Sequence, residues 1–109
     1  MNAEKELIAY FNDELRRDFT RGAAFMTPGV AALGSEAAQR IFDAIANYND
    51  FRRESDPYQE RDFGSFKIDG HTVFFKIDYY SKDMAVGSPD PSDPSVTTRV
   101  ITIMLAQEY

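Results

Sequence analysis

The chain has 109 residues and carries 18 acidic against 12 basic side chains, which gives a net charge of −6. Its length fits one domain over residues 1–109, and its hydrophobic fraction of 43% is typical of a globular protein. The absence of cysteine excludes disulfides, thiolate nucleophiles and Cys-ligated metal centres. The excess of acids disfavours direct binding to nucleic acid or to an anionic membrane. The sequence lacks cysteine, and it lacks the basic and then apolar start that is typical of a signal peptide. We therefore expect a cytoplasmic protein.

Residues 3–19 are predicted to form an amphipathic helix, because apolar side chains recur there at helical spacing. These side chains are Leu7, Ile8, Phe11, Leu15 and Phe19. Asn2 is the expected N-cap, and Gly22 is the expected stop signal.

A short strand is predicted from Ala23 to Thr27, and the following Pro28-Gly29 is typical of a turn. A second helix is predicted over about 36–48, with Ser35 as its N-cap. Its apolar face comprises Ala37, Ala38, Ile41, Phe42, Ile45 and Tyr48.

The clearest local signal in the chain is a β-hairpin around Asp69-Gly70. Both residues of this dipeptide accept the positive φ that a two-residue type I′ turn requires, and such a turn fixes the register of its strands. The predicted pairs are Ile68–His71, Phe66–Val73 and Gly64–Phe75 on an apolar face, and Lys67–Thr72, Phe63–Lys76 and the ion pair Arg61–Asp78 on the other.

Polar loops are predicted at 49–61 and 81–95, followed by a long β-branched strand over 96–106. The order of elements predicts an α+β fold, an antiparallel sheet of three to four strands with two helices packed on one face. Strand alternation predicts Tyr79 in the core, whereas Phe74 and Tyr80 project from the other face.

Groups suited to catalysis are few. The only histidine, His71, lies beside the hairpin turn, where a surface position is expected, and no phosphate-binding glycine loop is present. Acids cluster on both sides of the hairpin, but their spacing matches no EF-hand and no nuclease site. These acids are Asp56, Glu60, Asp62, Asp78, Asp83, Asp90 and Asp93. Loop acids more commonly stabilise turns, so we expect no catalytic residue, no metal site and no cofactor.

The negative charge is concentrated after the first forty-two residues. Residues 1–42 carry six acids and five bases, whereas residues 43–109 carry twelve acids and seven bases. Spaced carboxylates can present phosphate-like charge to a basic protein, and tyrosines are common at interfaces. The alternative is an ordinary solvated surface, since a net charge of −6 is within the usual range for solubility. The residues expected to contact a partner are Asp56, Tyr58, Glu60, Asp62, Tyr80, Asp83, Asp90 and Asp93.

A set of motifs spans nearly the whole chain. They are Thr27-Pro28-Gly29-Val30, Asp56-Pro57-Tyr58, Glu60, Asp62-Phe63-Gly64, Val73-Phe74, Lys76-Ile77-Asp78-Tyr79-Tyr80, Gly87-Ser88-Pro89-Asp90-Pro91, Arg99-Val100, Thr102-Ile103-Met104-Leu105-Ala106 and Glu108-Tyr109. With these motifs the sequence resembles a small uncharacterised family of alphaproteobacterial proteins, frequent on plasmids and other mobile elements. In that family a Trp usually stands in place of Phe75 and a His often in place of Arg61. The arginine at position 61 removes a possible metal ligand or base.

The resemblance implies a role by analogy, because small acidic proteins of mobile elements are often inhibitors of the anti-restriction or anti-CRISPR type. We therefore expect a non-enzymatic inhibitor that binds a basic nucleic-acid-binding surface of a host defence complex, such as a CRISPR surveillance complex, and blocks target DNA binding. Two alternatives stay open, a small metal-dependent enzyme that uses the acidic loops, and an antitoxin or immunity protein that neutralises a basic toxin.

Overall fold

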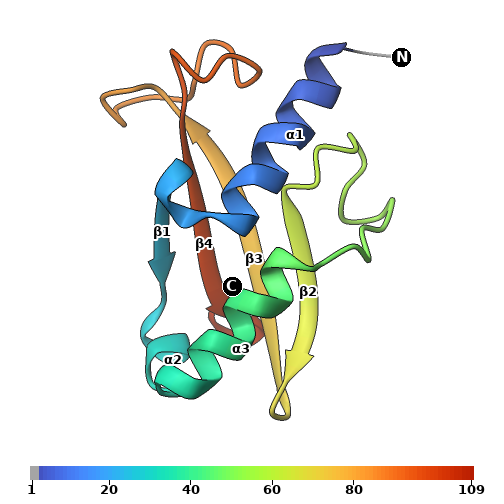
Figure 1. The fold of residues 1–109 in the computed structure, drawn as a ribbon, viewed down its shortest axis with the longest axis vertical. Helices are drawn as coiled ribbons and strands as arrows, with labels where there is room; N and C mark the ends of the chain where they lie inside the picture. Colours follow the sequence, from blue (N-terminus) through green and yellow to red (C-terminus); the bar gives the residue numbers. More distant parts are fainter. Residues whose placement is uncertain (1–2) are drawn as a thin grey trace.

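Four strands form one mixed sheet in the computed structural model, which describes residues 3–109 (Figure 1). The strands are β1 (Ala23–Met26), β2 (Phe63–Ile68), β3 (His71–Tyr80) and β4 (Thr98–Leu105). The α-helices are α1 (Ala3–Arg17), α2 (Pro28–Ala31) and α3 (Ser35–Ala46), and the 3₁₀ turns are η1 (Phe19–Arg21) and η2 (Ala106–Glu108). The strand order is β1-β4-β3-β2, so the last strand lies in the interior of the sheet. The predicted α+β class, with helices packed on one face of a sheet, is confirmed.

The hairpin of β2 and β3 has the predicted register. Ile68 pairs with His71, and the alignment continues to Phe63 opposite Lys76. Asp69 and Gly70 adopt φ of 51° and 83°, as a type I′ turn requires. The predicted ion pair of Arg61 with Asp78 is wrong, because β2 begins only at Phe63 and Arg61 turns away.

Strand β1 pairs with β4 in parallel, with Ala23 opposite Val100 and Met26 opposite Ile103. The other neighbouring strands are antiparallel, so the sheet is mixed where an antiparallel sheet was predicted. The parallel pairing joins segments more than seventy positions apart in the sequence, and no local turn encodes it.

The ends of the helices differ in detail from their predicted positions. Helix α1 ends at Arg17, and the predicted cap Asn2 lies outside the described residues. The predicted cap of α3 is wrong, because Gly34, with a φ of 95°, is the N-cap and Ser35 is already helical. The Pro28-Gly29 turn is the start of α2, since proline is well suited to the first turn of a helix.

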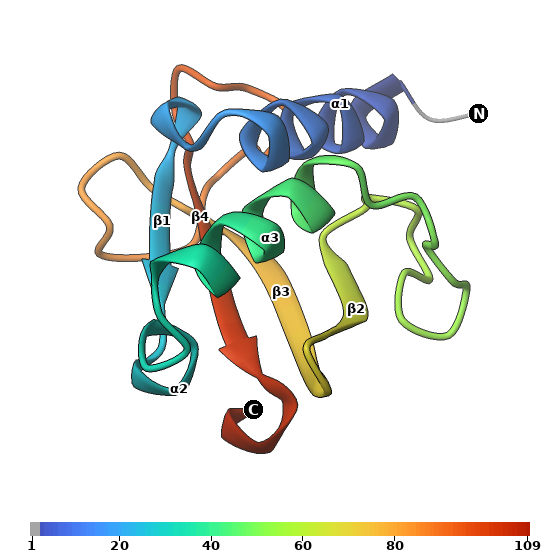
Figure 2. The ribbon, with the colours of Figure 1, turned by 60° about the horizontal axis from the view of Figure 1, so that its bottom comes forward.

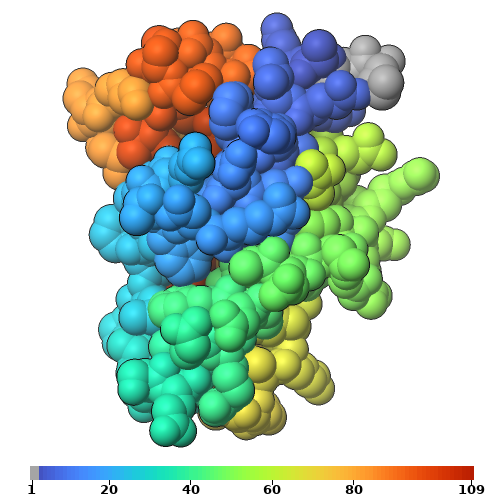
Figure 3. All heavy atoms as spheres, viewed as in Figure 1, coloured from blue at the N-terminus to red at the C-terminus, as the bar shows by residue number. Residues whose placement is uncertain are grey.

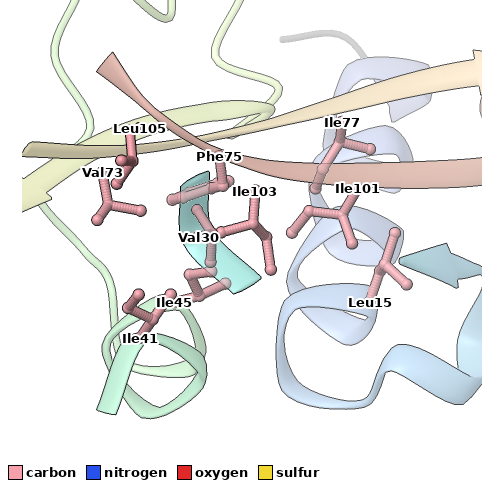
Figure 4. Close-up of a cluster of buried hydrophobic side chains, with 10 residues drawn as sticks. All are labelled: Leu15, Val30, Ile41, Ile45, Val73, Phe75, Ile77, Ile101, Ile103 and Leu105. Atoms are coloured by element: carbon pink, nitrogen blue, oxygen red, sulfur yellow. The ribbon is translucent and has the colours of Figure 1, made fainter. Parts of the chain in front are cut away.

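The core lies between the helices and the inner face of the sheet (Figure 4). Its buried members are Leu15, Val30, Ile41, Ile45, Val73, Phe75, Ile77, Ile101, Ile103 and Leu105. Figure 3 shows α1 and α3 closing over this side, so that little of the sheet remains visible. The ring of Phe75 occupies the space in front of Gly64, where a Cβ atom would clash with it and with Tyr48.

The opposite face of the sheet is partly covered by the end of the chain. Phe74 and Tyr80 lie on this face, as predicted, paired with Met104 and Thr98 of β4. The ring of Tyr109 packs against Phe74 with centroids 5.7 Å apart. Within residues 3–109, no helix has both the length and the apolar character needed to cross a membrane.

Candidate functional site

The end of β3 and the loop that precedes β2 enclose an open cavity of about 310 Å³, which we call the acidic groove. It is lined by the acids Asp56, Asp62 and Asp78, by Lys76, and by the aromatic rings of Tyr58, Phe63 and Tyr109. The groove therefore brings together three of the predicted partner-binding residues, Asp56, Tyr58 and Asp62. Tyr58 and Tyr109 are its most accessible rings, at 70% and 76% exposed.

Asp56 shapes the wall of the groove. Its side chain is buried, and its Oδ1 accepts hydrogen bonds from the backbone nitrogens of Glu60 (2.9 Å) and Arg61 (3.1 Å). The same loop places Gln59 and Arg61 at positive φ, a conformation that side chains usually avoid. The buried carboxylate thus stabilises a strained turn, and it leaves the exposed charge of the groove to other acids.

Asp62 is the least compensated acid of the groove. Its backbone oxygen accepts a hydrogen bond from Ile77 N at 2.8 Å, which holds it beside β3. Burial raises the pKa of Asp62 to about 6, and the negative charge of Glu60 adds to the shift. Asp78 is partly neutralised by Lys76, whose Nζ lies 3.3 Å from Asp78 Oδ2. A cation placed in the groove would stabilise the charged form of Asp62.

A buried polar network lies behind the groove and joins the sheet to α1. Asn12 is fully buried, and its Nδ2 donates to the Glu60 backbone oxygen (3.0 Å) and to the Tyr79 hydroxyl (2.8 Å). The Tyr79 hydroxyl donates to Glu60 Oε1 at 2.8 Å, and Arg99 Nε donates to Asn12 Oδ1 at 3.0 Å. Glu60 is therefore held as a hydrogen-bond acceptor at the back of the site. Burial and the bond to Glu60 raise the pKa of Tyr79, so its hydroxyl remains a proton donor.

A second network binds the same loop to α1. Asp13 receives two hydrogen bonds from Arg61, at 3.0 Å from Nε and 2.6 Å from Nη2, and a third from Arg16 at 2.6 Å. Arg16 also donates to the backbone oxygens of Ile45 (2.7 Å) and Tyr48 (3.1 Å). Arg61 therefore has a structural role in this chain, as an anchor of the loop on α1.

The remaining predicted acids lie in the loop after β3, on the other side of β3 and β4 from the loop that precedes β2 (Figure 2). Asp83 accepts hydrogen bonds from Ser81 Oγ and Ala85 N, and Asp93 accepts them from Ser95 Oγ and N. These bonds lower the pKa of both carboxyls, so both remain charged. Asp90 makes the same contacts with Ser92. Tyr80 is half-buried on the sheet face and forms a bridge to Gly87 of this loop.

Sequence reasoning missed several residues of these networks. Tyr109 and Lys76 line the groove, while Asn12, Asp13 and Arg99 support it from behind. A signal for Arg99 was present, because it shares the strand parity of Ile101 and Ile103, which are buried. A charged residue on a core face is rare and needs a partner.

Side chains that could ligate a metal do not converge in the described residues. In residues 3–109, no three or more His, Asp or Glu side chains lie close enough together to hold a metal ion. His71 is exposed at the hairpin turn, away from both acidic loops. No contact in the described part of the chain favours the metal-dependent enzyme over a binding role.

Residues 26–108 match the model of a family described as "Protein of unknown function (DUF3768)". The chain belongs to this family. No curated protein matches it, and no solved structure matches it. The DUF3768 match runs from Met26, the last residue of β1, to the end of η2. It includes both acidic loops and the lining of the acidic groove except Tyr109, but not α1.

Proposed function

We propose that this DUF3768 protein is a non-enzymatic binding protein whose acidic groove receives basic side chains of a partner protein. The observation that carries the proposal is Asp62, a carboxyl group whose pKa is raised to about 6 in a surface cavity whose cation, Lys76, is paired with Asp78. Such a group destabilises the free protein when it ionises, and an incoming lysine or arginine removes that penalty.

Aromatic rings give the groove a second means of recognition. Tyr58 and Tyr109 flank the acids, and an arginine or lysine can stack its apolar stem or its charge on such rings. Tyrosine is enriched at protein interfaces, and both of these rings are accessible. The charged acids Asp83 and Asp93 extend the negative potential beyond the groove and would steer a basic partner toward the protein.

The partner we propose is a nucleic-acid-binding protein of host defence, with the chain acting as an inhibitor of the anti-restriction or anti-CRISPR type. Its acidic surface would occupy the basic groove that normally receives target DNA. Support for this finer step comes from the resemblance to mobile-element proteins and from the net charge of −6.

The test is affinity capture from an alphaproteobacterial lysate in low and in high salt, with matched variants. Asp62→Asn combined with Asp78→Asn removes two charges from the groove while retaining oxygen acceptors. Glu36→Gln combined with Asp43→Asn removes two charges from exposed positions of α3 as the control.

The proposal predicts that the wild type and the α3 variant capture a nucleic-acid-binding complex in low salt and release it in high salt. The groove variant should capture much less of it, and added target DNA should compete with the wild type. Equal capture by both variants would refute a role for the groove, and failure of DNA to compete would refute the inhibitor mechanism.

A further inference from the structure

A second cavity, of about 340 Å³, lies between α1 and the loop that follows β3. We call it the cationic cavity, because Arg21, Lys82 and Arg99 line it against a single acid, Glu14. This local excess of positive charge contrasts with the net charge of −6 for the whole chain. The volume is at the lower end of the range that small ligands occupy in proteins.

Arg99 is the central group of the cationic cavity. It is only 5% exposed, yet within residues 3–109 no carboxylate forms an ion pair with it. Its Nε donates to Asn12 Oδ1 at 3.0 Å and its Nη2 donates to the Pro91 backbone oxygen. In the described part of the chain Nη1 has no hydrogen-bond partner. A buried guanidinium without a counterion is costly, and an anion that reaches Nη1 would offset that cost.

The walls of the cationic cavity suit a ligand with an apolar part. The guanidinium carbon of Arg99 lies 5.2 Å from the ring centroid of Phe11, which is itself a lining residue together with Tyr10. Lys82 makes no ion pair within the described residues, and Arg21 is 3.6 Å from Asp18 in an exposed pair. Lys82 and Arg21 can therefore both turn toward an anion, while the rings of Tyr10 and Phe11 pack against its apolar part.

We propose that the cationic cavity binds a small organic oxyanion, a carboxylate or a phosphate ester, with its charged oxygens at Arg99 and Lys82 and its apolar part on Tyr10 and Phe11. This site is separate from the acidic groove, and its ligand has the opposite charge. An acidic protein segment is the competing occupant that the experiment must distinguish.

The test is an NMR titration of backbone amides at constant ionic strength with four probes: phenyl phosphate, benzoate, inorganic phosphate and benzylammonium. Phenyl phosphate or benzoate should bind saturably, with shifts centred on Tyr10, Phe11 and Thr97, and the tighter of the two identifies the anionic group. Inorganic phosphate should bind more weakly because it lacks the apolar part, and benzylammonium should not bind. Equal shifts with benzylammonium, or shifts that do not saturate, would overturn the proposal.

Replacing the buried Arg99 would disturb the network around Asn12 and could affect folding. The variants are therefore made at exposed cationic side chains. Lys82→Gln should weaken the binding of phenyl phosphate about threefold, the size expected for one exposed ion pair. Arg53→Gln, in the loop on the other side of α1, should leave the binding unchanged. An unchanged affinity in Lys82→Gln would overturn the assignment. Binding of an acidic peptide without binding of either aromatic anion would overturn the small-ligand proposal in favour of a protein partner.

Discussion

Replacing Asp13 with asparagine should destabilise the protein strongly, because Asp13 is the counterion of two arginines. Arg16 is 2% exposed at its side chain and stacks over the rings of Phe51 and Phe75, at 5.0 and 5.9 Å from their centroids. Asp13→Asn is nearly isosteric, so it removes the negative charge with little change in packing. It leaves Arg16 as a buried cation whose remaining acceptors are backbone oxygens and the asparagine amide oxygen.

The magnitude follows from the burial of the two partners. Removing one member of a buried ion pair typically costs about 3–5 kcal/mol, and the surviving acceptors of Arg16 favour the lower end, about 3 kcal/mol. The side chain of Arg61 is 40% exposed, so its pair with Asp13 adds only about 0.5 kcal/mol. We therefore expect the free energy of unfolding to fall by about 3–4 kcal/mol in Asp13→Asn and by less than about 1 kcal/mol in Arg61→Gln.

Urea unfolding followed by circular dichroism measures both values. Burial opposes the charged form of Asp13, but the hydrogen bonds from Arg61 and Arg16 outweigh it and hold the pKa below its ordinary value of 3.8. The stabilisation is therefore complete at neutral pH and is lost as the pH falls below 3.8, where wild type and variant should converge. A loss below about 1 kcal/mol at pH 7, or equal losses in Asp13→Asn and Arg61→Gln, would refute this account of the network.

Three further predictions concern the groove, the packing of β2 on the core, and the network behind the groove. Asp62→Asn should stabilise the protein by about 1 kcal/mol at pH 7.5, a value reduced for the partial exposure of Asp62. The pKa of Asp62 in the folded state is raised to about 6, so near pH 4 this side chain is uncharged in the folded protein. The stabilisation by Asp62→Asn should therefore vanish near pH 4, and thermal melting at pH 7.5 and at pH 4 checks this. Gly64→Ala should cost about 3 kcal/mol in urea unfolding, since the new methyl group overlaps the ring of Phe75, and a loss under 1 kcal/mol would contradict that overlap. Tyr79→Phe should cost about 1–2 kcal/mol, because Asn12 and Glu60 each lose a buried partner; unchanged stability would mean that water replaces the hydroxyl.

The hairpin shows how far local sequence information reaches in this fold. The Asp69-Gly70 turn and the alternation of apolar residues specify the register of β2 and β3 without knowledge of any distant contact. The helices and the burial of Ile41 and Ile45 follow from periodicity in the same way.

Contacts between distant segments were not predictable from such patterns. Extending the hairpin pairs Arg61 with Asp78, but the positive φ of Arg61 ends the strand pairing, and Arg61 forms its ion pair with Asp13 of α1. The parallel pairing of β1 with β4 depends on how the helices cross the sheet, and no local turn sequence specifies that crossing.

The candidate site was predicted in part for the same reason. Asp56, Tyr58 and Asp62 come together because one loop carries them, and Asp83, Asp90 and Asp93 share a second loop. The burial of Asp56 under its own loop was not predictable from composition, because this burial depends on the backbone conformation of residues 59–61. Tyr109 reaches the groove only through the fold of η2.

A carboxyl-carbon NMR titration of Asp62 shows whether this acid is poised for a cation. The titration is made on the free protein and again with an arginine-rich peptide as the cationic probe, with a glycine–serine peptide of equal length as the control. We predict a pKa near 6 in the free protein, a clear decrease with the arginine-rich peptide and no change with the control. An Asp62 that titrates near its ordinary value of 3.8 in the free protein, or a pKa that the arginine-rich peptide leaves unchanged, would contradict the account.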